Sequence, residues 1–491
     1  MNRPFPKDAT RKALLSALPG NDISSLEDVR TPGFTYVPPS HARALDPENT
    51  IVEGIRGAGK SFWWLALNSE PHRNFIRAAF PEVRFGDGLE VAQGYGAQAS
   101  PHWPSKDVLK KLSANFEPRH IWRAVIATHA KFDGAFPING KWEEKTRWVA
   151  ENPEDFDVAL YRRDAELTKN RTMLVILFDA LDRLADDWTG IRPLAKSLLQ
   201  VGLDTRSLRS IRLKLFVRPD MLEDKEIIGF PDASKLLARK VSLAWRRVDL
   251  YALLFQCLGN APDGGGEFRS HCEAEFRLTW SQSDNGVAWV IPKPLRTDED
   301  LQKIVFHAIA GSTMASGASG HKRGFPYTWL PNHLLDGREQ VSPRSYAAAL
   351  RHAASVEDMP TEWPYALHYK AIQQGVQEAS RVRVDEITKE DYPWVEVVMT
   401  PLRRQVTVPC SKEEILAIWG SSGVIGTLND QMRNKEVKLP PQHLQDGAEG
   451  VLEDLVQLGL VQYLSGDRIQ MPDVYRIAFG LGRRGGVKPL R

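Results

Sequence analysis

Eight residues near the amino end constrain this chain more than any other part of it. Residues 54–61, Gly-Ile-Arg-Gly-Ala-Gly-Lys-Ser, match the pattern G-x-x-x-x-G-K-[ST] at every fixed position. An apolar lead, Ile51 and Val52, precedes the motif, and the helix-compatible run 62–67 follows it. A strand, a glycine-rich turn and a helix start together let backbone N–H groups surround phosphate oxygens. We therefore predict a phosphate-binding loop here. A surface turn that matches by chance fits this context less well.

The residues of the motif have distinct expected roles. Lys60 is expected to contact the β- and γ-phosphates of a bound nucleotide, and the Ser61 hydroxyl is expected to bind Mg²⁺. The start of the following helix adds partial positive charge that favours an anion. The predicted nucleotide-binding residues are Gly54, Gly57, Ala58, Gly59, Lys60, Ser61 and Phe62. The predicted ligands are therefore ATP and Mg²⁺.

A second segment resembles the part of a nucleotide-binding site that binds the metal ion. Residues 173–178 are continuously apolar, which indicates a strand buried on both faces of a parallel sheet. Asp179 ends this run, at the strand edge where open α/β sheets bind ligands, and is expected to hold Mg²⁺. Asp182 is the candidate general base that orients the attacking water. Taken alone, the segment is equally compatible with a buried strand that ends at an aspartate helix cap.

A third apolar run predicts a further strand of the same sheet. Residues 211–217 are followed by Arg218, and a helical pattern at 191–199 separates them from the second run. This succession predicts a strand–helix–strand unit with parallel strands. If the strands are neighbours, Arg218 emerges near the γ-phosphate and senses it. Pairing with a surface acid is the alternative, and the residues do not decide between the two.

Composition excludes several classes of protein. A formal net charge of +2 on 491 residues is too small to attract the whole protein to nucleic acid or to a membrane, so any basic surface must be local. No stretch approaches the ~20 apolar residues of a membrane span, and the first residues do not form a signal peptide. The three cysteines have no metal-ligand spacing, and we expect a reducing cytoplasm. The length suggests about three domains.

Together these segments resemble the P-loop ATPases of the AAA+ and STAND (signal-transduction ATPase) groups. Residues 179–182, Asp-Ala-Leu-Asp, look like the STAND form of the metal-binding motif and lack the Asp-Glu pair of most AAA+ proteins. Arg183 stands where STAND proteins often have a second acid, so the identity of the base stays open. A further similarity is Ser342-Pro343-Arg344, a capped helix start like that of the lid helix in these families. The resemblance implies that Arg344 reaches back to the nucleotide. Without the family, it is more often a solvated residue.

The resemblance covers roughly residues 30–355, and two segments stand apart within it. The long separation of the two motifs predicts an insertion around 85–165, with amphipathic helices near 105–114 and 119–130. It serves either as a partner surface or as extra packing. Residues 311–324 are small and polar and predict a flexible loop. Its tip, 321–323, is more often solvated than bound to phosphate.

The last 80 or so residues predict a winged helix. A capping box at 411–414, a short helix over 424–432 and a third helix from Asp446 precede a hairpin that turns at 465–467. Such a domain binds DNA in many proteins. The expected outward residues of the third helix are Glu449, Glu453, Asp454 and Gln457, and the acids among them would repel phosphates. Basic residues are expected on the wing and tail: Arg468, Arg476, Arg483, Arg484, Lys488 and Arg491. We therefore favour a protein-contact or autoinhibitory module over a groove-reading one.

These observations lead to one prediction of architecture. We expect an α/β fold: a parallel-sheet P-loop core with a helical lid and a C-terminal winged-helix domain. The expected parts are an N-terminal arm (1–45), the ATPase core (46–250), the lid and linker region (251–405) and the winged-helix-like domain (406–491).

The corresponding function is ATP binding and hydrolysis coupled to conformational change or assembly. The candidate catalytic residues are Asp182, Arg218 and Arg344. An arginine from a neighbouring subunit, Arg183 or Arg218, makes a homo-oligomer plausible, and a switch would need a separate effector protein. The STAND resemblance implies a role in bacterial defence against phage. The alternative is a DNA-associated ATPase that resembles origin-recognition ATPases.

Overall fold

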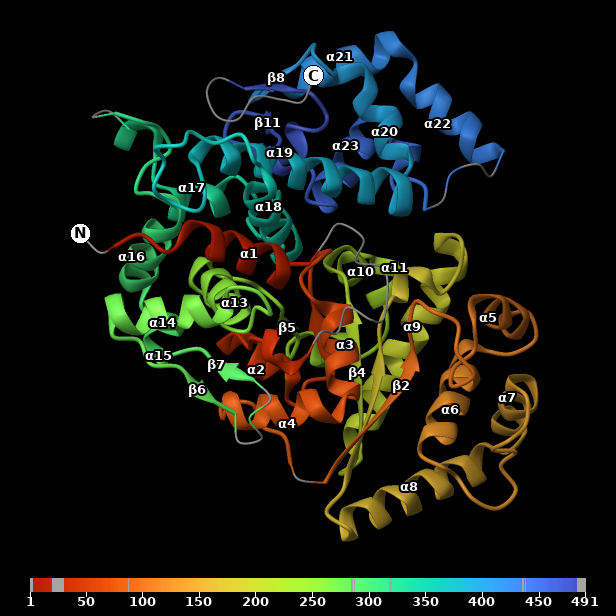
Figure 1. Ribbon diagram of the computed structural model, residues 1–491. Helices are drawn as coiled ribbons and strands as arrows, with labels where there is room; N and C mark the ends of the chain where they lie inside the picture. The colour runs from red at the N-terminus through yellow and green to blue at the C-terminus, as the bar shows by residue number, and fades with distance from the viewer. Residues whose placement is uncertain are drawn as a thin grey trace. The chain divides into compact units, whose positions relative to one another are not determined.

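The structure is a computed structural model and describes residues 3–19, 31–86, 88–283, 286, 288–317, 320–434, 437 and 439–483. The chain divides into two compact units (Figure 1). One is the continuous segment Val37–Ala244, and the other combines Met1–Tyr36 with Trp245–Arg491. Among the described residues, no helix has both the length and the apolar character needed to cross a bilayer.

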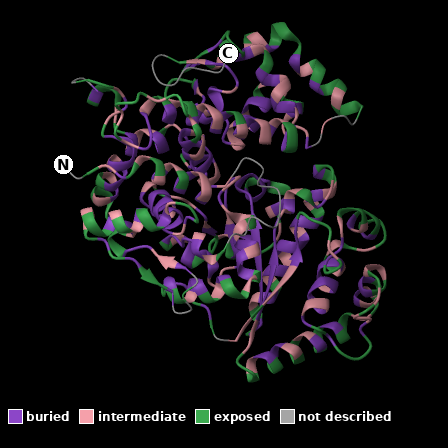
Figure 2. Ribbon diagram, in the orientation of Figure 1, coloured by how far each residue is buried: buried purple, intermediate pink, exposed green. Residues whose placement is uncertain are grey.

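The first unit is built on a five-stranded parallel sheet. The strand order is β2-β3-β4-β1-β5, so β4 lies between β3 and β1. The strands are β1 (Ile51–Glu53), β2 (Leu89–Tyr95), β3 (Met173–Phe178), β4 (Ile211–Val217) and β5 (Val241–Ser242). Every residue of β4 is buried, as is all of β3 after Met173, which explains their continuous apolar runs (Figure 2). The α/β fold with a parallel-sheet core is therefore confirmed, as are the three strands predicted from sequence.

Helices connect these strands and pack against the sheet. The predicted helix between the second and third apolar runs is α9 (Trp188–Asp204), which joins the parallel neighbours β3 and β4. The helix after the phosphate-binding motif is α3 (Lys60–Asn68). Other helices of the unit are α2 (Pro39–Leu45), α4 (Glu70–Ala79), α10 (Pro219–Glu223), α11 (Lys225–Ile228) and α12 (Ala233–Leu237).

The segment expected as an insertion begins with part of the core sheet. Strand β2 is an edge strand paired along its length with β3, so the region 85–165 is not wholly inserted. The two predicted helices are confirmed, and two more follow: α5 (Lys106–Ser113), α6 (Pro118–His129), α7 (Trp142–Glu151) and α8 (Pro153–Lys169). Trp122 of α6 is fully buried and donates its indole N–H to the carbonyl oxygen of Leu194 at 2.9 Å. At least α6 therefore enlarges the core.

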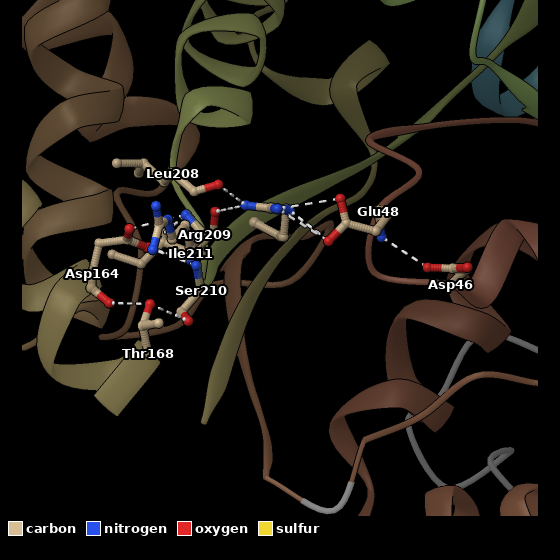
Figure 3. Close-up of polar contacts among 9 residues, drawn as sticks. Asp46, Glu48, Asp164, Thr168, Leu208, Arg209, Ser210 and Ile211 are labelled. Atoms are coloured by element: carbon tan, nitrogen blue, oxygen red, sulfur yellow. Dashed lines mark hydrogen bonds and ion pairs between the residues drawn. The ribbon is translucent and has the colours of Figure 1, made fainter. Parts of the chain in front are cut away.

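A buried carboxylate joins α8 to the start of β4 (Figure 3). Asp164 accepts hydrogen bonds from the backbone N–H groups of Arg209, Ser210 and Ile211 at 2.7–3.1 Å. The Thr168 hydroxyl, one turn further along α8, lies 2.8 Å from the hydroxyl of Ser210. These donors precede or begin the strand, and their N–H groups are directed to the Asp164 carboxylate, so the acid fixes where β4 starts.

The second unit contains the amino-terminal segment. Helix α1 (Lys7–Ala17) packs against α14 (Gly265–Phe276) and α18 (Pro343–Ser355), which makes it part of this unit instead of a separate arm. The unit boundaries at residues 36–37 and 244–245 thus differ from the expected 45–46 and 250–251. Other helices of eight or more residues before the carboxyl-terminal part are α13 (Arg247–Gly259), α16 (Glu299–Ala310) and α19 (Tyr369–Asp385). The shorter helices there include α15 (Lys293–Thr297), α17 (Pro326–Asn332) and α20 (Trp394–Met399).

The carboxyl-terminal part has the predicted winged-helix elements. They are β9 (Cys410–Ser411), α21 (Lys412–Ser422), α22 (Val424–Arg433), α23 (Gly447–Gln457), β10 (Gln462–Leu464) and β11 (Arg468–Gln470). The hairpin β10–β11 turns at the predicted residues, and β9 adds a third strand beside β11. Trp419, Leu452 and Leu455 are buried in its core. The winged helix is therefore confirmed.

Two of the predicted surface residues of this domain are buried. Asp454, expected on the outside of α23, is 4% exposed and accepts hydrogen bonds from the backbone N–H and Nδ1 of His443 at 3.0 and 2.7 Å. Arg476, expected on the tail, is fully buried and donates Nε to Asp473 at 2.7 Å. Each acquires a local partner that offsets the cost of burying its charge. Arg484, Lys488 and Arg491 lie outside the described residues.

Candidate nucleotide site

The glycine-rich loop joins β1 to α3 with the backbone that the motif predicts. Gly57 and Gly59 have φ angles of +75° and +102°, the left-handed region that glycine adopts without steric cost. A Cβ atom on Gly54 would lie 3.2 Å from the Ala58 methyl and 3.3 Å from Cγ of Lys60. The loop therefore closes tightly on itself at Gly54, and a side chain there would press against Ala58 and Lys60.

Lys60 is the first residue of α3, and its side chain turns back into the loop. Its Nζ donates hydrogen bonds to the carbonyl oxygens of Gly54 at 2.7 Å and Ile55 at 3.0 Å. Burial lowers the pKa of Lys60 to about 8, even though the nearby carboxylates Asp179 and Asp182 favour its charged form. An additional anion beside this amine would stabilise the ammonium.

Ser61 links the loop to the end of β3. Its hydroxyl donates to Oδ2 of Asp179 at 2.6 Å, although 118 positions separate the two residues. Asp179 is 4% exposed, and burial raises its pKa, opposed by the Ser61 hydrogen bond and the Lys60 charge. The two predicted metal ligands therefore meet as expected.

Asp182 reaches the same edge of the sheet through a left-handed turn. Ala180 has φ +57° and ψ +39°, an uncommon conformation for a residue other than glycine, and the short helix η3 (Leu181–Arg183) follows. The Asp182 carboxylate accepts a hydrogen bond from Nη1 of Arg218 at 3.3 Å. Burial alone would raise the pKa of Asp182, but Arg218, Lys60 and Arg183 outweigh it and hold that pKa below its ordinary value. Asp182 is thus kept as a carboxylate.

Arg218 directly follows β4, between the loop and Asp179. Because β4 pairs with both β1 and β3, the condition on which its predicted role depended is met. Its acidic partners are not surface residues: Asp182 is partly buried, and Asp220 is 6% exposed. Asp220 accepts from Nε at 3.0 Å and from Nη2 at 2.8 Å.

Sequence reasoning missed two contributors to this region. Asp220 was detectable as an acid two residues after Arg218, the arginine that follows a strand. His41, from α2, had no local signal. It is fully buried and accepts a hydrogen bond at Nδ1 from the indole N–H of Trp63 on α3 at 3.1 Å. Burial lowers the pKa of His41 to about 3, so it is a neutral structural support for α3.

Three other predicted residues have different surroundings. Arg344 lies in the first turn of α18, which Ser342 caps as expected, and donates Nη1 to Oε1 of Glu386 at 2.7 Å. It belongs to the second unit, and its contact with nucleotide stays a prediction. Arg183 is exposed beside Asp182. Phe62 packs edge-on against Trp63, with ring centroids 5.0 Å apart.

The residues present fit a nucleoside triphosphate with Mg²⁺. The loop offers left-handed glycines and an ammonium group, and the first turn of α3 offers backbone N–H groups. Ser61 and Asp179 offer two hard oxygen ligands, which suits an ion that keeps waters and phosphate oxygens for its other positions. Within the described ranges, no group of three or more His, Cys, Asp or Glu side chains is arranged to hold a metal by protein ligands alone.

The expected 311–324 loop is partly described. Residues Gly320–Arg323 form the short helix η5, and residues 318–319 lie outside the described ranges. His321, Lys322 and Arg323 are exposed, in agreement with the solvated alternative.

Comparison with known proteins gives likeness of fold only. No family model matches the chain, and no curated protein matches its sequence. Among solved structures, the ORC1 protein of Aeropyrum pernix in complex with DNA is 15% identical over 96% of this chain and 94% of its own, with a TM-score of 0.36. The ORC2 protein of the same organism, in ADPNP–ADP complexes, is 13% identical over 90% and 93%, with a TM-score of 0.37. Cdc6p from Pyrobaculum aerophilum is 10% identical over 88% and 83%, with a TM-score of 0.27. Because these values are low, the function of this chain is inferred from the geometry of its own residues.

Proposed function

We propose that this chain binds ATP with Mg²⁺ at the loop 54–61 and hydrolyses it. The observation that carries the proposal is the 2.6 Å hydrogen bond between Ser61 and Asp179, which joins the two halves of the motif in space. A serine after the loop lysine and an acid at the end of a parallel strand form the metal-binding pair of P-loop NTPases.

Each residue has a role that follows from its position. Lys60 neutralises phosphate charge, and Ser61 with Asp179 binds the metal. Mg²⁺ supplies charge stabilisation for the transferring phosphoryl group. Asp182, kept ionised by Arg218, is the carboxylate available to orient water, and Arg218 is the nearest cation to it. Hydrolysis of this kind depends on positioning and electrostatics, so loss of one charge is costly.

The decisive experiment is nucleotide titration of Lys60→Ala. We expect ATP affinity to fall by about two orders of magnitude or more. The variant loses a charge-assisted contact to phosphate and also the hydrogen bonds of the lysine to the loop backbone. Lys235→Ala is the matched control: it also removes one lysine of the same unit, in a pair with Asp232 whose side chains are largely exposed. Equal ATP affinity in Lys60→Ala and the control would refute the assignment of the loop.

We further propose that nucleotide state is coupled to conformational change or assembly of the chain. The connection of the two units supports this, because the chain enters the sheet-bearing unit from the second unit at residues 36–37 and returns to it at residues 244–245. Light scattering with ATP, with ADP and without nucleotide tests the assembly. A single mass in all three states would contradict it. The proposed cytoplasmic location and the role in phage defence stay predictions.

A DNA-associated ATPase is the second candidate, favoured by the complete winged helix. Its charges are mixed: Glu449 of α23 is exposed, and Arg468 at the wing is the exposed basic residue nearest the turn. Arg483 donates to Asp473 at 3.0 Å, which reduces the cationic surface further. ATPase rates with and without duplex DNA, at two salt concentrations, decide the question. Stimulation that fades with salt supports the DNA function, and no response supports a protein-contact role.

A further inference from the structure

The guanidinium group of Arg218 lies between two carboxylates that hold it unequally. Asp220 accepts from Nε at 3.0 Å and from Nη2 at 2.8 Å, so two atoms of each group face one another. Asp182 accepts from Nη1 alone, at the longer distance of 3.3 Å. The contact with Asp220 is therefore a two-point contact, and the contact with Asp182 is a single one.

This difference makes one contact permanent and the other exchangeable. A two-point contact between planar groups fixes the plane of the guanidinium as well as its position. Arg218 and Asp220 are 9% and 6% exposed, and breaking their pair would leave a buried charge without its partner. Asp182 is more accessible, with 16% of its side chain exposed, and lies in the short helix η3.

The exchangeable contact lies beside the proposed nucleotide. Strand β4 runs between β1 and β3, so Arg218 emerges between the loop and Asp179. The charges of Arg218, Asp182 and Asp220 all act on the Lys60 amine in the loop. A terminal phosphate held by Lys60 and Ser61 would therefore compete with the Asp182 carboxylate for Nη1 of Arg218.

We propose that Asp220 is a positioning residue that holds Arg218 so that its Nη1 group exchanges between Asp182 and the terminal phosphate of a nucleoside triphosphate. This inference rests on the function proposed above. Without a triphosphate, Arg218 occupies the carboxylate that is needed to orient water. The terminal phosphate takes over Nη1, and Asp182 is released. A diphosphate lacks this acceptor and leaves the Arg218–Asp182 pair in place.

The proposal predicts opposite effects for two substitutions that each remove one negative charge. In Asp182→Asn, the carboxylate that competes with the phosphate is gone, so binding of the triphosphate strengthens. In Asp220→Asn, the two-point contact is lost and Arg218 turns toward Asp182, the remaining carboxylate, so binding of the triphosphate weakens. A general charge effect would instead strengthen triphosphate binding in both variants, because each loses one negative charge near the phosphates.

The test is calorimetric titration of the full chain with Mg²⁺ and either ADP or a non-hydrolysable ATP analogue. The measured quantity is the ratio of the ADP dissociation constant to that of the analogue. We expect Asp220→Asn to lower this ratio about tenfold and Asp182→Asn to raise it several-fold, the size of one charge-assisted hydrogen bond. Asp224→Asn is the matched control. It removes a buried acid four residues further on that pairs with Arg192 at 2.8 Å, and its ratio should equal that of the wild type.

Arg218→Lys is the second variant, which keeps the charge but loses the two-point contact, and it should lower the ratio as Asp220→Asn does. An unchanged or raised ratio in Asp220→Asn overturns the proposal. If that variant does not fold, an unchanged ratio in Arg218→Lys overturns it in the same way. A wild-type chain that binds neither nucleotide, or a Lys60→Ala chain that binds both normally, refutes the proposed function instead.

Discussion

Substitution of Asp164 by alanine should lower the stability of the sheet-bearing unit more than substitution of any surface residue on the same helix. The carboxylate of Asp164 accepts from three consecutive backbone N–H groups of residues 209–211, and the donors on Ser210 and Ile211 are buried (Figure 3). Alanine leaves these donors without their acceptor. An unpaired buried donor costs about 1–3 kcal/mol, so the two buried donors together cost about 2–6 kcal/mol.

The expected result is a loss of roughly 3 kcal/mol, which lies within that range, and the third donor, on Arg209, adds little because it is only part-buried. For a unit of this size, that corresponds to a fall of roughly 10 °C in the melting temperature of Val37–Ala244. Asp164→Asn should cost less. Its amide oxygen can replace Oδ1, which accepts from all three donors, but its NH₂ group would face the N–H of Arg209.

The assay combines thermal unfolding with amide hydrogen exchange. Exchange at Ser210 and Ile211 should accelerate strongly, because these amides lose their hydrogen-bond acceptor. Glu166→Ala is the control: it removes an acid of the same helix whose side chain is 51% exposed and pairs with Arg163 at 3.3 Å. The surface pair should cost less than about 1 kcal/mol. If Asp164→Ala melts no lower than Glu166→Ala, then Asp164 does not fix the start of β4 and the reasoning is wrong.

Two further predictions concern buried residues, one in each unit. Lys214 of β4 is 1% exposed and donates Nζ to the carbonyl oxygens of Ala44, Asp46 and Asn49, and burial lowers its pKa to about 7. Between pH 7 and 10 the unfolded chain binds a proton there that the folded chain does not, so the free energy of unfolding should rise with pH by up to about 4 kcal/mol. Chemical unfolding at several pH values should show this rise in the wild type and a smaller rise in Lys214→Met. An equal rise of the unfolding free energy with pH in both proteins would contradict the prediction. In the second unit, a Cβ atom on Gly375 of α19 would overlap the carbonyl oxygen of Ala349 on α18, so Gly375→Ala should separate two packed helices at a cost of about 1–3 kcal/mol. Gly420→Ala, where a Cβ atom meets nothing within 4 Å, is its control in thermal unfolding, and equal melting temperatures would show that α18 and α19 have room to adjust.

Much of the site was predictable because its signals are local. The loop 54–61 requires glycines at positions whose backbone is left-handed, and Gly57 and Gly59 have that backbone. The runs 173–178 and 211–217 are apolar at every position except Arg212 and Lys214. Both are strands with those bounds in the structure. The capping and turn residues of the winged helix likewise act over three or four positions.

Other features depended on which segments meet in space. Strand β2 lies at the end of the sheet and carries polar residues, so its sequence has no continuous apolar run, and only its pairing with β3 makes it part of the core. Asp454 and Arg476 are charged residues on helices, and a charged residue at such a position is usually solvated. Their partners, His443 and Asp473, are eleven and three residues away along the chain, but only the packing of the surrounding elements decided that these pairs are buried.

By itself, the sequence determined the conformation of the glycine-rich loop, the strands that flank it and the class of fold, because glycine conformations, caps and apolar runs act within a few neighbouring residues. Only the tertiary structure decided which charges meet. The pairing of Ser61 with Asp179 and of Arg218 with Asp182 follows from the order β3-β4-β1, which places the ends of three separate strands at one edge. The physical reason is that an ion pair depends on distance in space, and strand order sets that distance without leaving a pattern along the chain.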